Sequence, residues 1–191
     1  MEKKKDMTKE LLANCFRELL ETVPFEKITI KMITEKAGLI RPTFYKHFQD
    51  KYDLVEWIFR TEIADNVNLI INSSKEYDAL LLLFRCMEKD RRFYKKLFLM
   101  EDSPNSFENI LTRYLTATMG NFLIKHNATG SLEDAQVAIE MITAYHTHGI
   151  VQAIRQWIRK DNKISAESFY NVCQFILSHA LTDLMEIDQD Q

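Results

Sequence analysis

Hydrogen-bond donors are crowded between positions 41 and 51 of this 191-residue chain. Arg41 can give two N–H groups to guanine O6 and N7, and the Lys, His and Tyr side chains that follow can donate to phosphate oxygens. The donors in the first half of this stretch are Arg41, Thr43, Tyr45, Lys46 and His47. Their types and spacing predict a helix that meets double-stranded DNA, and not a catalytic centre.

The elements around these donors are typical of a helix-turn-helix. Thr29 is a suitable N-cap for a helix over 30–37, and Gly38 can end that helix in a left-handed conformation. Pro42 is tolerated at the start of the next helix because its missing N–H would have no partner there. Phe44 and Phe48 lie four residues apart, so we expect them to form the apolar side of that helix, opposite the donors.

Apolar residues recur at helical spacing along the rest of the chain, which predicts an all-α protein. A helix over 8–22, capped by Asp6 or Thr8, should complete a three-helix DNA-binding domain over residues 1–50. Residues 51–191 should then form a helical bundle for effector binding and dimerisation. Its helices are expected over 50–71 after an Asp50 cap, 77–90, 91–100, 106–125, 132–158 after a Ser131 cap, and from Ser165 to about 184.

Composition excludes several classes of protein. Residues 1–60 hold 12 basic and 10 acidic residues, and residues 61–191 hold 13 basic and 18 acidic residues. A slightly basic front therefore precedes an acidic body.

The three cysteines are far apart, which argues against a disulfide framework and for a reducing compartment. No apolar run approaches the roughly 18 residues of a membrane span, and no secretory leader is indicated. We therefore expect a cytoplasmic protein with no membrane contact.

The stretch from residue 28 to residue 54 resembles the DNA-binding half of the TetR family of bacterial transcription regulators. The resemblance implies that Arg41, Pro42 and Thr43 approach base edges. It also implies that the phosphates are bound by Thr29, Lys31, Tyr45, His47 and Lys51. Ile40 departs from the family pattern because it stands where many members have a serine that caps the recognition helix.

The string from Arg41 to Phe59 is also similar to a subgroup of that family which includes the activator of dihydroxyacetone-kinase operons. Members of the subgroup respond to a kinase-like protein partner. The resemblance therefore leaves two forms of control open. One is a repressor released by a small molecule, and the other is an activator that responds to a protein.

The last two predicted helices carry a broad apolar stripe that suits a four-helix interface between two copies of the chain. The expected dimer residues are Gly149, Ala153, Trp157, Phe169, Cys173, Ile176, Ala180 and Leu184. An effector cavity would be lined by aromatic residues and methionines, although plain core packing explains each of them singly. The candidates are Phe84, Met87, Tyr94, Tyr114, Phe122, Met141 and Tyr145.

No cofactor, metal site or enzyme activity is expected. His146 and His148 are two residues apart and point in different directions on a helix, so they would not chelate a metal without a second helix. The chain has no Gly-rich phosphate loop, nucleophile elbow or HExxH sequence. The sequence therefore predicts a dimeric, operator-binding regulator of the repressor type that is controlled by an effector. A helical interaction module with an idle DNA-reading domain is the alternative from another class.

Overall fold

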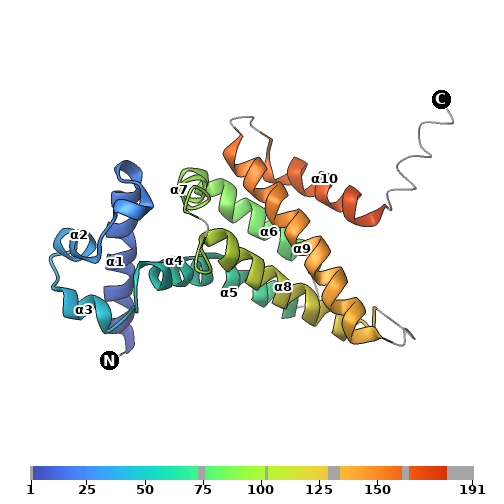
Figure 1. Cartoon of the computed structure of the whole chain (residues 1–191), viewed down its shortest axis with the longest axis horizontal. Coiled ribbons are helices and arrows are strands. Elements are labelled where there is room, and N and C mark those ends of the chain that lie inside the picture. The colour runs from blue at the N-terminus through green and yellow to red at the C-terminus, as the bar shows by residue number, and fades with distance from the viewer. Residues whose placement is uncertain (1, 73–75, 102, 129–133, 161–163, 180–191) are drawn as a thin grey trace.

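The computed structural model describes residues 2–72, 76–101, 103–128, 134–160 and 164–179, and every regular element in these ranges is a helix. The elements are α1 Glu2–Thr22, η1 Phe25–Lys27, α2 Ile30–Lys36, α3 Arg41–Tyr45, α4 Lys51–Phe59, η2 Arg60–Ala64, α5 Asp65–Asn72, α6 Glu76–Lys89, α7 Arg91–Leu97, α8 Phe107–Lys125, α9 Ala135–Arg159 and α10 Ala166–Ser178. The all-α prediction is confirmed. Figure 1 shows α1–α3, the reader, at one end and α6–α10, the body, at the other. α4 leads from the reader to the body, and α5 continues among the body helices.

Predicted side-chain caps begin several of these helices. The Thr29 hydroxyl accepts a hydrogen bond from the Met32 N–H at 3.2 Å, and the Asp50 carboxylate accepts from Tyr52 N–H at 2.8 Å and Asp53 N–H at 2.9 Å. Ser165 accepts from the Ser168 N–H in the same way. Each bond satisfies an amide that has no partner within its own helix, so these residues fix where α2, α4 and α10 begin.

Some helix ends differ from the prediction. α1 begins at Glu2 and not near residue 8, because the Lys, Glu, Asp and Met residues before position 8 include no helix breaker. α3 ends at Tyr45 rather than near Phe48, because the His47 N–H bonds the Phe44 carbonyl and tightens the chain into a turn. The predicted Ser131 cap and the end of the last helix near residue 184 lie outside the described residues.

The predicted helix over 50–71 contains a π-helical turn, η2, between α4 and α5. There the Asp65 N–H bonds the carbonyl of Arg60, five residues earlier. The buried side of the helix advances by the same five residues across this turn, from Ile58 to Ile63 and from Phe59 to Ala64. Both halves of the helix, on either side of η2, therefore face apolar neighbours.

Polar contacts tie the reader to the body near η2. Arg17 of α1 pairs with Glu62 of η2 and with Asp90 before α7, and its guanidinium lies 3.8 Å from the centre of the Phe93 ring. The Lys96 ammonium of α7 donates to the Leu20 carbonyl at 2.7 Å, near the end of α1. The orientation of α1 is therefore linked to the positions of α7 and η2.

Buried apolar side chains run without interruption from the reader into the body. α4 contributes Leu54 and Ile58 to the same core as Phe16 of α1 and Phe44 of α3. The core shows no gap at residue 50, so the boundary between 1–50 and 51–191 stays a prediction. In the described part of the chain, no helix is both long and apolar enough to cross a membrane.

Candidate nucleic-acid interface

The turn between α2 and α3 depends on the backbone conformation of Gly38, whose φ is +66°. The Gly38 N–H bonds the Glu35 carbonyl at 3.1 Å and the Leu39 N–H bonds the Thr34 carbonyl at 2.8 Å, which closes the end of α2. A Cβ on Gly38 would meet no atom within 4 Å. Glycine is therefore favoured here by its φ angle and not by lack of space.

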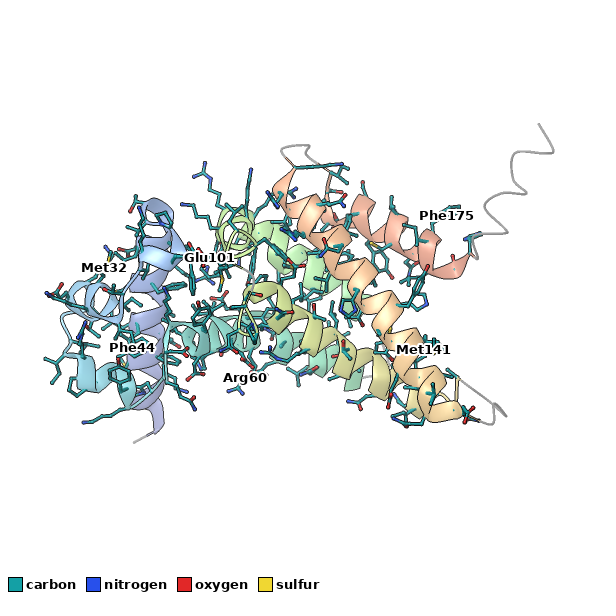
Figure 2. All side chains as sticks on the ribbon, viewed as in Figure 1. Met32, Phe44, Arg60, Glu101, Met141 and Phe175 are labelled. Atoms are coloured by element: carbon teal, nitrogen blue, oxygen red, sulfur yellow. The ribbon has the colours of Figure 1, made fainter. Side chains whose placement is uncertain are left out.

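The inner side of α3 is apolar, as the sequence predicted. Phe44 is fully buried and Phe48 is 2% exposed, with their ring centres 5.6 Å apart. The Phe48 ring also meets Trp57 of α4 edge-on, with the centres 5.8 Å apart. Figure 2 shows Phe44 at the reader end of the molecule, between α3 and α1. These rings fix α3 against the helices behind it.

The outer side of α3 carries the predicted donors. Arg41, Pro42, Tyr45 and Lys46 are exposed, whereas Thr43 and His47 are half-buried. Within the described residues, Arg41 makes no ion pair. Its guanidinium is thus available to a ligand, and its charge is not neutralised by a neighbouring carboxylate.

Ile40, at the start of α3, is 69% exposed and makes no side-chain cap bond. The two predicted residues of α2 also lie on the surface. Thr29 is exposed while its oxygen caps α2, which leaves its hydroxyl hydrogen for an acceptor, and Lys31 is exposed with Glu35 3.5 Å away.

Lys51 has a structural environment that its sequence position did not reveal. Its ammonium donates to the Phe25 carbonyl at 2.8 Å, the Ile28 carbonyl at 3.0 Å and the Glu26 carbonyl at 3.1 Å. It also lies 4.3 Å from the centre of the Phe25 ring, and burial lowers the pKa of the ammonium. The geometry thus engages all three N–H groups with the segment around η1 and supports a structural role. The phosphate role stays a prediction.

We expect Lys51→Met to lower the free energy of unfolding by about 2 kcal/mol, because three carbonyl oxygens lose a charged donor. Urea unfolding measures this change. The matched control is Lys46→Met on the exposed side of α3, which should change stability by less than about 0.5 kcal/mol. The structural role would be contradicted if Lys51→Met were as stable as the parent and lowered DNA affinity as much as Lys46→Met does. Lys51 would then be assigned to phosphate binding.

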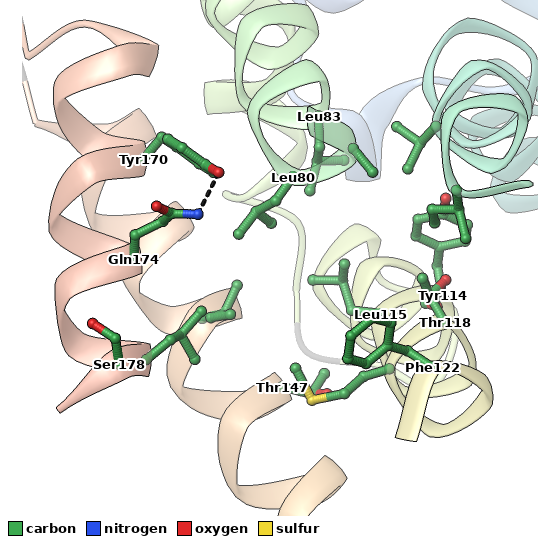
Figure 3. A pocket seen from close by; sticks show the side chains of 16 residues that line it. Leu80, Leu83, Tyr114, Leu115, Thr118, Phe122, Thr147, Tyr170, Gln174 and Ser178 are labelled. Carbon is green, nitrogen blue, oxygen red and sulfur yellow. Dashed lines mark hydrogen bonds between the residues drawn. The ribbon is translucent and has the colours of Figure 1, made fainter. Parts of the chain in front are cut away.

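The residues proposed for an effector cavity are divided by the structure into three groups. Phe84, Met87 and Tyr94 are buried in the core, and Met141 and Tyr145 are 68% and 79% exposed on the outside of α9. Tyr114 and Phe122 alone among the seven line a cavity of about 450 Å³ in the body, which we call the body cavity (Figure 3).

The residues proposed for a dimer interface are also divided. Trp157, Phe169 and Cys173 are buried within the chain, where the rings of Trp157 and Phe169 stack with centres 4.7 Å apart. Gly149 and Ile176 are exposed, Ala153 is half-buried, and Ala180 and Leu184 lie outside the described residues. Five other apolar side chains of α9 and α10 are at least 46% exposed. With Ile176 they form what we call the outer apolar face: Val137, Met141, Tyr145, Val172, Phe175 and Ile176.

The histidines do not mark a metal centre in the described structure. His146 is half-buried, and His148 is exposed and bonds the Ala144 carbonyl of its own helix at 2.8 Å. No group of three or more His, Cys, Asp or Glu side chains suited to a metal ion occurs among the described residues.

Comparison with known proteins supports the interpretation of the reader and extends it to the body. A family model described as bacterial regulatory proteins, tetR family, matches residues 17–58, and one described as transcriptional regulator C-terminal region matches residues 75–179. The chain is 30% identical over 122 residues to the HTH-type dhaKLM operon transcriptional activator DhaS of Lactococcus lactis subsp. lactis (strain IL1403). That match covers 59% of this chain and 63% of DhaS, less than two thirds of the relative's length.

Solved structures share the fold. A dihydroxyacetone kinase operon activator DhaS aligns with a TM-score of 0.61 at 23% identity, covering 95% of this chain and 96% of its own. The fatty acid degradation regulator FadR from Bacillus halodurans gives 0.57 at 14% identity, covering 91% and 97%. NalD, the secondary repressor of the MexAB-OprM multidrug efflux pump in Pseudomonas aeruginosa, gives 0.59 at 14% identity, covering 89% and 94%. Since the second family model spans more than half of the chain and the first covers the helix-turn-helix, the chain belongs to the TetR family and is a transcription regulator, not an enzyme.

Proposed function

We propose that this regulator binds a pseudo-palindromic DNA operator as a homodimer, with α3 of each copy in the major groove. The observation that carries the proposal is the two-sided build of α3. Phe44 and Phe48 hold its inner side in the core, and Arg41 stands on its outer side with no acidic partner among the described residues. A short helix fixed in this way can bring side chains to base edges without losing its own orientation.

The roles on the outer side follow from the chemistry of each group. Arg41 suits guanine, and the carbon surfaces of Pro42 and Thr43 suit a thymine methyl group. Tyr45, Lys46 and His47 donate to phosphates, together with Thr29 and Lys31 of α2, and set the register of the protein on the duplex.

The homodimer is supported by the outer apolar face. Its two most exposed members, Tyr145 at 79% and Met141 at 68%, lie one helical turn apart on α9, and Ile176 on α10 is 57% exposed. Side chains of this size, gathered on two helices, favour burial against an identical face in a two-fold arrangement. Two readers joined in this way would meet half-sites about 34 Å apart.

Control by an effector is supported by contacts that run from the body cavity to the reader. Tyr114 lines the cavity, and its hydroxyl donates to Asn68 Oδ1 of α5 at 3.1 Å. Beyond α5, Glu62 of η2 pairs with Arg17 of α1. A ligand that fits one position of α5 better than another would shift the spacing of the two readers, by no more than its difference in affinity for the two states.

Two directions of control remain as candidates. The family resemblance favours a repressor. The matched relative DhaS is named an operon activator, which favours activation by this chain as a second candidate. A reporter gene behind the selected operator separates them, because deleting the regulator raises expression for a repressor and lowers it for an activator.

Arg41→Ala should lower operator affinity by about 1–3 kcal/mol and relax the preference at one base position in each half-site, because the paired guanine contact is lost. The measurement is selection of bound fragments from the source genome at about 150 mM salt, followed by titration of the enriched site. Arg159→Ala is the control, because it removes the same charge from an exposed site on α9.

Enrichment of a palindrome by the parent and by Arg159→Ala, but not by Arg41→Ala, would support the proposal. Equal selection by all three proteins would mean that α3 does not read the bases. If the parent enriches no site, the selection is repeated with cell extract. Recovery of a palindrome then indicates a required protein or small-molecule partner, and continued absence of one favours an interaction module with an idle reader.

A further inference from the structure

The body cavity is bordered by five helices, opens to solvent, and has an almost entirely apolar lining. α5, α6, α8, α9 and α10 each contribute to its wall (Figure 3). The lining residues are Val67, Ile71, Ala79, Leu80, Leu83, Tyr114, Leu115, Thr118, Met119, Phe122, Thr147, Ile150, Tyr170, Gln174, Leu177 and Ser178. Its volume of about 450 Å³ falls within the range of pockets that hold small molecules.

None of these lining side chains is Lys, Arg, His, Asp or Glu. An ionised ligand would lose hydration in the cavity and would meet no opposite charge there. The free-energy cost of this desolvation is far larger than the free energy gained from apolar contacts. An uncharged ligand meets no such penalty. The wall therefore selects against anions and cations alike.

One polar group on the wall has no partner in the described structure. Thr147 of α9 is 1% exposed, and its hydroxyl makes no hydrogen bond there. Figure 3 shows its side chain at the cavity, between α9 and α8. Buried hydroxyl groups are nearly always hydrogen-bonded. Of the few without a partner in the described structure, this one lies on the cavity wall.

The Thr143 hydroxyl of α9, one turn before Thr147, is buried and also has no partner in the described structure, but Thr143 is not part of the cavity lining. Two threonines of α8, by contrast, bond their own helix. The Thr112 hydroxyl donates to the Glu108 carbonyl at 2.8 Å, and the Thr118 hydroxyl donates to the Tyr114 carbonyl at 2.9 Å. The other polar groups near the cavity are also engaged. Gln174 donates to the Tyr170 hydroxyl, and Tyr114 donates to Asn68. Thr147 is thus the lining hydroxyl best placed to bond a ligand.

We propose that the body cavity binds an uncharged, largely apolar molecule that carries one hydroxyl or carbonyl group, and that this group hydrogen-bonds the Thr147 hydroxyl. The inference rests on the proposed function in taking the cavity as the effector site. The binding itself is measured without DNA, so a failure here is distinguishable from a failure of operator recognition.

The test uses the full chain and the uncharged fluorescent probe N-phenyl-1-naphthylamine. Three competitors with ten-carbon chains and different charge are titrated at pH 7.5: decanol, decanoate and decyltrimethylammonium. Decanol is kept below its solubility limit, and the two ions are kept below their micelle concentrations. We expect one probe per chain and displacement by decanol at a concentration at least tenfold lower than either ion requires. Absence of saturable probe binding, or displacement by decanoate as readily as by decanol, would overturn the proposal.

Substitutions locate the site. Met119→Trp replaces a lining side chain by a larger one, whose indole ring would fill the cavity, so it should abolish probe binding. Ile124→Trp, on the exposed part of the same helix, should leave probe binding unchanged. Thr147→Val keeps the shape but removes the hydroxyl, so decanol affinity should fall about five- to tenfold. Thr147→Ser keeps the hydroxyl and should change it by less than about threefold. Equal decanol affinity in the Val and Ser variants would overturn the role of Thr147.

Discussion

A chain with both Tyr145→Asp and Ile176→Asp is expected to be a monomer in solution and to bind its operator on the order of 100-fold more weakly than the parent. The two carboxylates would lie within the outer apolar face, where pairing of two copies would bury them without a positive partner. A monomer engages one half-site at a time and loses the effective concentration that joining two readers provides, typically worth 10²–10⁴ in affinity.

Both positions are 57% or more exposed in the single chain, so the substitutions should leave its fold intact. Analytical ultracentrifugation measures the oligomeric state, circular dichroism checks the helix content, and titration of a full operator against a single half-site measures the loss. Leu69→Asp, at a 69% exposed position of α5, is the control and should remain dimeric. A double variant that stays dimeric would place the interface elsewhere.

Phe44→Ala is expected to lower the free energy of unfolding by about 3–5 kcal/mol, the usual loss for a fully buried phenylalanine. The cavity would form where α3 contacts the core, and the Phe48 and Tyr45 rings would each lose a neighbour. A change of this size is a large part of the stability of an ordinary domain. Operator binding should be lost at temperatures where the body is still folded, because α3 would no longer hold its orientation.

The adjacent substitution Tyr45→Ala is the matched control, since Tyr45 is 57% exposed. It should change the unfolding free energy by less than about 1 kcal/mol while still weakening DNA binding through a lost phosphate contact. Chemical unfolding followed by circular dichroism gives the first quantity for both variants. Comparable destabilisation by both would mean that the two rings contribute alike to the core and that α3 is not two-sided.

The local signals of the reader were predictable because each depends on neighbouring residues. Thr29 and Asp50 cap the helices that follow them, and Gly38 adopts the left-handed conformation that closes α2. The division of α3 into an apolar and a donor side follows from the four-residue spacing of Phe44 and Phe48. Lys51 was harder to interpret because its partners lie more than 20 residues away along the chain.

The surfaces of the body were predicted less well, since helical spacing shows that a face is apolar but not what covers it. Trp157 and Cys173 share the pattern of Ile176, yet the first two pack within the chain and the third is exposed. Tyr145 and Tyr114 look alike in sequence, but one lies outside and the other lines the cavity. The sequence did contain a sign that Thr147 is special. Thr143 and Thr147 are polar residues one turn apart on the otherwise apolar side of α9, and both are buried.

The π-helical turn was not marked in the sequence, because the buried residues Val55, Phe59, Ile63 and Val67 keep a spacing of four across it. It has a consequence for how this protein can change during evolution. Insertion or deletion of one residue between α4 and α5 would rotate one end of the molecule by about 100° relative to the other and move it by about 1.5 Å. Loops of the chain can change length at little cost. The number of residues in this segment is instead fixed by the parts of the core that α4 contacts on the reader side and α5 contacts on the body side.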